Sequence, residues 1–437
     1  MFGWEFPPFI SGGLGTACYG LTKAMTRLGA DVVFVLPQPV DTSHSSHVTL
    51  LTPEGTVPAR KLHDASARIR ILATDPRSAY ARPQDPAQRR QARPGDLGSA
   101  GLHGSANRPG SVVKSHYGGD LFDEVDRYTR MACRLIEGYS FDVIHAHDWM
   151  TYQAGMAASA MTGAPLIVHV HSTEFDRGGE LVNQRIYDIE RRGMHYAAHI
   201  IAVSSLTKSM IVSRYGIEPA KVTVVYNAID TDDRPEVEPP PRIRTHEKTV
   251  LFLGRITMQK GPEFFVAAAK KVLQQMDNVR FVMAGSGDLA PKVVEMAARE
   301  GIGRKLIFTG FLRGGDVERV FRIADLFVMP SVSEPFGLVP LEALSYGVPV
   351  IISKQSGVSE VLTNVLKVDF WDVDEMAKQI MAVLRSPSLH ARLSDQGRAE
   401  LSRLKWENSA RQCLELYERM RNRPIGGGVC QELEANN

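Results

Sequence analysis

Two glutamates lie eight positions apart around an expected strand-to-helix turn. An apolar, strand-like run covers residues 324–330, and a helical pattern covers residues 338–346. Glu334 precedes the helix and Glu342 lies one turn inside it. Both carboxylates can therefore accept hydrogen bonds from hydroxyl groups of a ligand bound at the start of this helix.

The start of the expected helix is suited to bind an anion. Its first N–H groups, near Phe336, Gly337 and Leu338, have no partner within the helix and carry the positive end of the helix dipole. Phosphate groups bind readily at such helix ends. Together with the two carboxylates, this turn predicts a site for a nucleoside diphosphate-sugar.

The double-glutamate turn resembles the Glu-x7-Glu signature of retaining GT-B glycosyltransferases. The resemblance is to the glycogen synthase and sucrose synthase superfamily, of the group 1, family 4 type, and is strongest to glycogen synthases. It runs from Met1 to about Met420. It implies an α/β fold in which two Rossmann-like parallel-sheet domains face each other across a cleft and a C-terminal helix crosses back. In that family Glu334 would hold the sugar hydroxyls and Glu342 the ribose.

Two cations follow a second strand-like run. Residues 250–253 lead into Gly254 and Arg255, and Lys260 stands five positions later, at the start of a helical pattern. Open parallel sheets bind ligands at the carboxyl ends of their strands, so these cations are interpreted as phosphate ligands. The resemblance identifies Arg255 and Lys260 as a diphosphate clamp.

Two glycine turns complete the expected donor site. One precedes an amphipathic pattern over residues 19–28, and the other follows the apolar run 281–284. The resemblance implies that the first faces the donor phosphates and that the second contacts the base and ribose. The residues concerned are Gly12, Gly13 and Leu14 in the first turn and Gly285 and Ser286 in the second.

Four histidines occur as two His-x-His pairs. They are His145, His147, His169 and His171. Alternation along a strand places each pair on one face, and the composition is that of a metal cluster. No cysteine or carboxylate spacing completes a site, so we expect no metal ion. The resemblance instead places His147 near the 6-hydroxyl of the sugar.

The segment after the second histidine pair is expected to face the acceptor. The resemblance assigns His171, Glu174 and Asp176 to that side, with an oligo- or polysaccharide acceptor, most simply an α-1,4-glucan. Ile10 stands where bacterial glycogen synthases carry a lysine. Transfer of another sugar to a glycoside, lipid or cell-envelope acceptor therefore stays open, as do a sugar-nucleotide epimerase and an inactive binding homologue.

The expected chemistry needs no cofactor. The substrate would be ADP-glucose or UDP-glucose, and the departing diphosphate would be neutralised by Arg255, Lys260 and helix-end amides. We expect no metal-binding Asp-x-Asp motif, and no side chain stands out as a covalent nucleophile. The family retains the anomeric configuration by a front-face route.

Alternating apolar runs and helical patterns must position these groups. This alternation predicts parallel sheets covered by helices. We expect an N-terminal domain over residues 1–234, a proline-rich hinge over 230–241, a C-terminal domain over 245–404 and a return helix over 405–422. A disordered insertion is expected over about 75–110 and a disordered tail over 424–437, since both segments are poor in large apolar residues.

Composition limits the function classes. The 437 residues carry a net charge of +2, so no polybasic surface indicates nucleic acid. The four cysteines lack disulfide-framework spacing, which favours reduced thiols in the cytoplasm. There is no signal peptide and no transmembrane-length apolar run. We expect a soluble protein, with peripheral membrane contact and oligomeric state left open.

Overall fold

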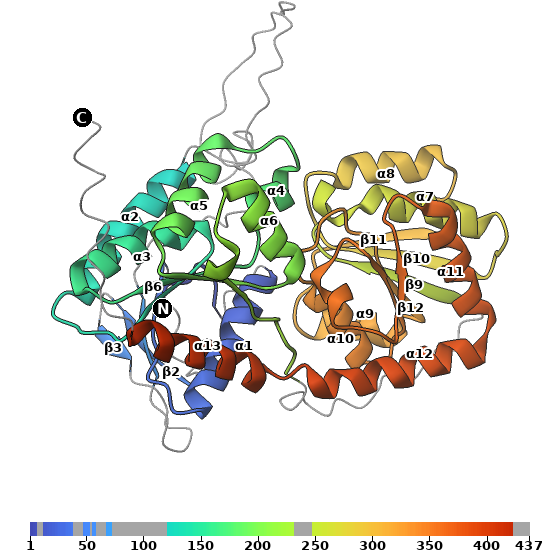
Figure 1. Cartoon of the computed structure of the whole chain (residues 1–437). Coiled ribbons are helices and arrows are strands. Elements are labelled where there is room, and N and C mark those ends of the chain that lie inside the picture. Colours follow the sequence, from blue (N-terminus) through green and yellow to red (C-terminus); the bar gives the residue numbers. More distant parts are fainter. Residues whose placement is uncertain are drawn as a thin grey trace, which may run out of the picture.

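The computed structural model describes residues 1–6, 12–37, 47–52, 55–57, 67–71, 120–230 and 247–422. Two α/β units lie side by side, and the chain crosses back to the first unit at its C-terminal end (Figure 1). The expected insertion over 75–110, the hinge after Asp230, the tail over 424–437 and Ile10 lie outside the described residues.

The N-terminal sheet is almost entirely parallel. Its strands are β1 (Val33–Leu36), β2 (Val48–Thr52), β3 (Gly55–Val57), β4 (Ala67–Ile71), β5 (Ile144–His147), β6 (Leu166–Val170), β7 (His199–Ala202) and β8 (Val222–Val224). They form the orders β3-β2-β4-β1 and β5-β6-β7-β8, and only β2 and β3 pair antiparallel. Phe2 joins the two halves because it forms parallel bridges to Val35 and Ala146.

Helices cover both faces of this sheet. They are α1 (Gly13–Arg27), α2 (Asp120–Ile136), α3 (Trp149–Thr162), α4 (Glu174–Gly178), α5 (Gln184–Tyr196) and α6 (Ser205–Tyr215), with the 3-10 turn η2 (Pro219–Lys221). Successive strand residues point to opposite faces. Thus Leu166 and Val168 of β6 join the core that includes Trp149 of α3, while Ile167 joins the core that includes Leu21 of α1. Burial on both faces explains the continuous apolar runs.

The C-terminal sheet contains six parallel strands. They are β9 (Lys248–Leu253), β10 (Val279–Ala284), β11 (Leu306–Gly310), β12 (Leu326–Met329), β13 (Val350–Ser353) and β14 (Leu366–Val368), in the order β11-β10-β9-β12-β13-β14. Along the chain, β10 and β11 are added on one side of β9, and β12, β13 and β14 are then added on the other side of β9. The strand order therefore reverses between β9 and β12, and a ligand site is expected at the carboxyl ends of these two strands.

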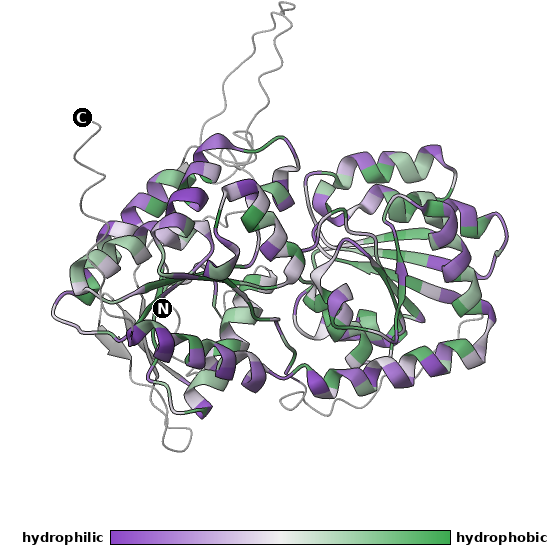
Figure 2. Cartoon of the chain, viewed as in Figure 1, coloured by the Kyte–Doolittle hydropathy of each residue, from purple (hydrophilic) through white to green (hydrophobic). Residues whose placement is uncertain are grey.

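The second sheet is also covered on both faces. Its helices are α7 (Pro262–Leu273), α8 (Ala290–Arg299), α9 (Gly315–Ile323), α10 (Leu338–Ser345), α11 (Val373–Arg385) and α12 (Pro387–Glu400), with the turns η3 (Met258–Lys260), η4 (Gly357–Glu360) and η5 (Leu401–Arg403). The strands are apolar, whereas polar residues gather on the outer faces of helices such as α12 (Figure 2). In the described part of the chain, no helix combines the length and apolar character that crossing a membrane requires.

The last helix, α13 (Trp406–Arg421), returns to the N-terminal unit. It lies beside α1 (Figure 1), and its buried face joins the same core. The approach is close at Gly20, where an added Cβ would lie 2.2 Å from Nε1 of Trp406. Tyr417 also hydrogen bonds to the ring of His145 on β5. The expected return helix is therefore present.

Candidate active site

The two predicted clamp cations follow β9, at the point where the strand order reverses. Arg255 is half-buried just after the strand, and Lys260 ends the short turn η3. The Nζ atom of Lys260 forms an ion pair with Oε2 of Glu334, which lies in the loop after β12. The exposed fractions of these side chains are 21% and 9%. The structure thus brings together a cation and a carboxylate that are far apart in the sequence.

Gln259 holds the two loops in register, a role that no motif in the sequence indicated. The residue is 4% exposed, and its Oε1 accepts a hydrogen bond from Nη2 of Arg255 at 3.4 Å. Its backbone carbonyl accepts a hydrogen bond from the N–H of Val332 at 2.9 Å. The loop that carries Lys260 is therefore fastened to the loop that carries Glu334.

The glycine turn after β10 packs directly on the loop after β9. Gly285 has φ of 143°, and an added Cβ would lie 1.8 Å from the carbonyl oxygen of Gly254. Only glycine fits this conformation and approach. The next residue, Ser286, is exposed and accepts a backbone hydrogen bond from Ile256 at 2.9 Å. The predicted base-and-ribose turn and the clamp loop therefore form one continuous surface.

The double-glutamate turn ends at the N-terminus of α10. Gly337 is the N-cap with φ of 102°, a left-handed conformation that favours glycine. Phe336 is buried, and its carbonyl accepts a hydrogen bond from Val358 at 2.7 Å. Leu338 begins the helix and Glu342 is half-buried within it. The helix start is thus fixed close to Glu334, with its amides and dipole available for an anion.

A second helix start faces α10 from the other unit. Gly12 is the extended N-cap of α1, and the helix begins at Gly13. A Cβ added to Gly13 would lie 3.8 Å from Cδ1 of Leu338, the first residue of α10. Leu14 packs against the N-terminal core. The positive ends of two helix dipoles therefore converge across the boundary between the units, which favours a multiply charged anion.

The four histidines form a stack at the carboxyl ends of β5 and β6. The centroids of the His145 and His147 rings are 4.3 Å apart, and those of His169 and His171 are 4.2 Å apart. The Nδ1 atom of His147 lies 3.0 Å from Nε2 of His171. Burial lowers the pKa of His147 well below its usual range and that of His171 to about 3, so both rings are neutral at pH 7.

Asp148 organises the loop above this stack, a role that its position in the sequence did not indicate. Its φ of 59° is the only positive value at a non-glycine position among the described residues. Its Oδ1 accepts hydrogen bonds from the N–H groups of His171 and Ser172 at 2.7 and 3.3 Å. Burial raises the pKa of its carboxyl to about 7. Backbone strain of this kind is common at functional sites.

The two predicted acceptor-side carboxylates are buried and already have protein partners. Glu174 pairs with Arg177, and its Oε1 accepts a hydrogen bond from the N–H of Asn183 at 3.0 Å. Asp176 forms a capping box with Thr173 at the start of α4. The Thr-x-x-Asp and Glu-x-x-Arg spacings are sequence signals for these local contacts. The acceptor-side role of both residues stays a prediction.

Asp176 also connects the two units. Its Oδ1 accepts a hydrogen bond of 2.6 Å from Oγ of Ser333, the residue before Glu334. Close by, a Cβ added to Gly179 would lie 3.6 Å from Cε of Met258 on η3. The loop that carries the double-glutamate turn therefore contacts α4, and the loop that carries the clamp cations contacts the residue that follows α4.

Sequence comparisons with protein families cover most of the chain. Residues 1–92 match the starch synthase catalytic domain, residues 59–233 match glycosyltransferase family 4, and residues 233–400 match glycosyl transferases group 1. An uncharacterised glycosyltransferase of Methanocaldococcus jannaschii is 30% identical over 295 residues, which are 64% of this chain and 75% of that protein. A glycogen synthase of Mycobacterium tuberculosis is 25% identical over 425 residues, which are 95% and 93% of the two chains.

Solved structures share the fold. Sucrose-phosphate synthase from Thermosynechococcus elongatus superposes with a TM-score of 0.67 at 19% identity, covering 94% of each chain. HepE from Anabaena, solved with UDP and glucose, superposes with a TM-score of 0.66 at 17% identity, covering 95% of this chain and 98% of its own. These similarities define the GT-B fold. Together with the sequence comparisons, they show that the chain belongs to the group 1 glycosyltransferases and is of the glycogen synthase-like type.

Proposed function

We propose that the protein transfers glucose from ADP-glucose or UDP-glucose to the end of an α-glucan, with retention of configuration and formation of an α-1,4 linkage. The observation that carries this proposal is the convergence of two helix N-termini beside Lys260 and Glu334. Such a site suits a diphosphate with a hydroxyl-rich group attached to it.

Each residue has a chemical task in this proposal. Arg255, Lys260 and the amides of the two helix starts stabilise the negative charge that builds on the departing diphosphate. Glu334 holds the sugar hydroxyls, and Glu342 holds the ribose. The acceptor hydroxyl attacks the anomeric carbon on the face that the diphosphate leaves, and the departing phosphate takes the proton of that hydroxyl.

His147 is assigned to the 6-hydroxyl of the sugar. Its ring is fully buried, and its Nε2 has no hydrogen-bond partner among the described residues. A neutral imidazole can donate or accept one hydrogen bond there. The burial means that the two units must separate, or the loop of His171 must move, before a hydroxyl reaches this ring. Opening and closing of the cleft is therefore part of the proposed cycle.

The glucan acceptor rests on the similarity to glycogen synthase over nearly the whole chain. A second candidate is transfer to a small phosphorylated acceptor. It is favoured by a relative named D-inositol 3-phosphate glycosyltransferase in Mycobacterium marinum, which is 27% identical over 344 residues, or 71% of this chain and 73% of that protein. The structure of HepE in complex with UDP and glucose supports a nucleotide sugar as donor.

The proposed reaction requires no metal ion, because protein cations and helix ends neutralise the leaving group, and we place it in the cytoplasm. The test incubates purified protein with a panel of nucleotide sugars, with and without maltooligosaccharides or inositol phosphate, in the presence of EDTA. Mass spectrometry should show maltooligosaccharides one hexose longer. Extension of inositol phosphate alone would select the second candidate, and a free epimerised sugar would overturn the transferase assignment.

A further inference from the structure

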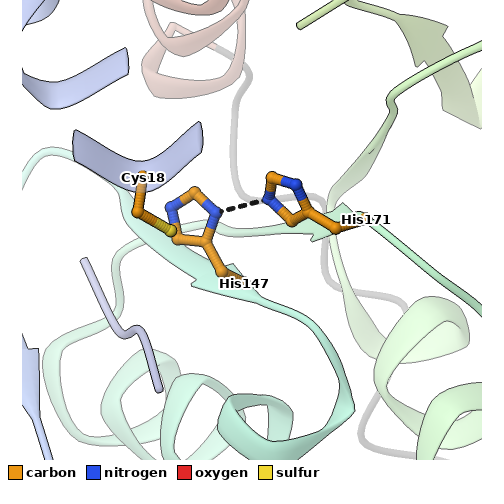
Figure 3. Close-up of side chains that lie close together, drawn as sticks. All are labelled: Cys18, His147 and His171. Atoms are coloured by element: carbon orange, nitrogen blue, oxygen red, sulfur yellow. Dashed lines mark hydrogen bonds between the residues drawn. The ribbon is translucent and has the colours of Figure 1, made fainter. Parts of the chain in front are cut away.

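We propose that Cys18, His147 and His171 form an inhibitory site for a thiophilic divalent cation such as Zn²⁺. The three side chains come from α1, from β5 and from the loop after β6, and they converge in the structure (Figure 3). One ligand atom of each lies within 4.8 Å of the other two. The sequence shows no metal-like spacing because the thiol reaches the histidines only through the fold.

The donor atoms need only a small adjustment to bind one ion. With Zn–S near 2.3 Å and Zn–N near 2.0–2.1 Å, two ligand atoms of a tetrahedral ion lie roughly 3.3–3.6 Å apart. Nδ1 of His147 and Nε2 of His171 already lie 3.0 Å apart. Closing the triad therefore requires side-chain movements of about 1 Å or less, without a change of fold.

The other ring nitrogen of His147, Nε2, is buried without a hydrogen-bond partner among the described residues. It can carry the hydrogen of the neutral ring while Nδ1 binds the ion. A second possible triad, His145, His147 and His169, shares the same ring. A thiophilic ion would select the set that contains Cys18. His171 is the partly exposed member of the triad, whereas Cys18 and His147 are buried.

Metal binding requires two changes of protonation. The hydrogen that His147 and His171 share across their contact must move to the outer nitrogen of one ring, so that both facing nitrogens present a lone pair. Burial raises the pKa of Cys18 well above its usual range, so the free thiol keeps its proton. Binding exchanges that proton for the metal: Zn²⁺ joins the thiol and two imidazoles, a Zn–S bond replaces the S–H bond, and one H⁺ leaves to solvent.

The consequence is inhibition rather than catalysis. The ion ties α1 to the His171 loop, and a hydroxyl reaches the ring of His147 only when that loop moves or the two units separate. This regulatory role rests on the proposed function, whereas occupancy of the site does not. Mg²⁺ prefers oxygen ligands and should not bind here.

The test adds Co²⁺ to the purified full-length protein and records the thiolate-to-cobalt charge-transfer band, with metal stoichiometry from mass spectrometry. One equivalent should produce the band, and Zn²⁺ should displace it. Cys18→Ser should abolish the band. Cys413→Ser should keep it, because Cys413 is an equally buried thiol that lies outside the triad. Cys18→Ala serves if the serine variant unfolds, and thermal midpoints check folding.

Glycosyl transfer is measured separately, with and without Zn²⁺. We expect Zn²⁺ to lower wild-type turnover at least tenfold and to leave Cys18→Ser turnover within twofold of its metal-free value. A band that persists in both Cys18 variants, or no band in the wild type, would overturn the site. A band with Zn²⁺-insensitive turnover would overturn the inhibition alone. If no transfer is found at all, the spectroscopic result still decides the site and the proposed function fails separately.

Discussion

Removal of the Lys260 charge should slow transfer by about 10²-fold or more. Two unit charges about 4 Å apart attract by roughly 4 kcal/mol at an effective dielectric constant of 20. Lys260 is mostly buried beside Glu334, so the cation acts in a partly desolvated environment. Because Arg255 and the two helix starts share the leaving charge, we expect a loss of about 3 kcal/mol of transition-state stabilisation. Arg255→Ala should show a loss of the same order.

The assay is steady-state turnover of donor with saturating acceptor. Lys260→Met keeps the aliphatic stem and should match Lys260→Ala, which separates the charge from the packing. Lys248→Ala is the control, because Lys248 forms an ion pair with Asp325 at the opposite end of β9 and should leave turnover unchanged. Wild-type turnover in Lys260→Met, with folding intact, would refute the clamp assignment.

Three further predictions concern neighbouring groups. Glu342→Ala should mainly raise KM for the donor, whereas Glu334→Ala should also lower kcat; equal effects on KM alone would contradict this division of roles. Ser333→Ala removes the hydrogen bond to Asp176 between the units and should raise donor KM roughly fivefold, the scale of about 1 kcal/mol; unchanged kinetics would show that the contact does not support closure. The carboxyl of Asp148 has a pKa raised to about 7, so its contribution to stability falls as pH rises from about 4 to about 7. The difference in thermal midpoint, Asp148→Asn minus wild type, should therefore be more positive at pH 8 than at pH 5. A difference that does not change with pH would count against a buried charge at Asp148.

Local patterns were sufficient to predict where the residues assigned to the donor fall in the fold. Arg255 and Lys260 lie between a strand-like apolar run and a helical pattern in the sequence. In the structure they lie after β9 and before α7. Glu334 follows β12 in the same way. Since carboxyl ends of neighbouring parallel strands share one edge, strand order explains the ion pair between Lys260 and Glu334.

Other features depend on the fold as a whole. Cys18 meets the histidines only after α1 packs on the sheet, and the left-handed conformation of Asp148 is imposed by the loop it organises. Strands β2 to β4 were not predicted. In β4 (Ala67–Ile71) the sequence Ala-Arg-Ile-Arg-Ile alternates polar and apolar residues, so it lacks the continuous apolar run that marks a strand buried on both faces.

The most direct test is the product that the purified protein makes from ADP-glucose or UDP-glucose and a maltooligosaccharide in EDTA. The proposal predicts chains that grow by single glucose units and are fully digested by an amylase specific for α-1,4 linkages. Extended chains that resist this amylase, or transfer only from another nucleotide sugar, would contradict the assigned reaction.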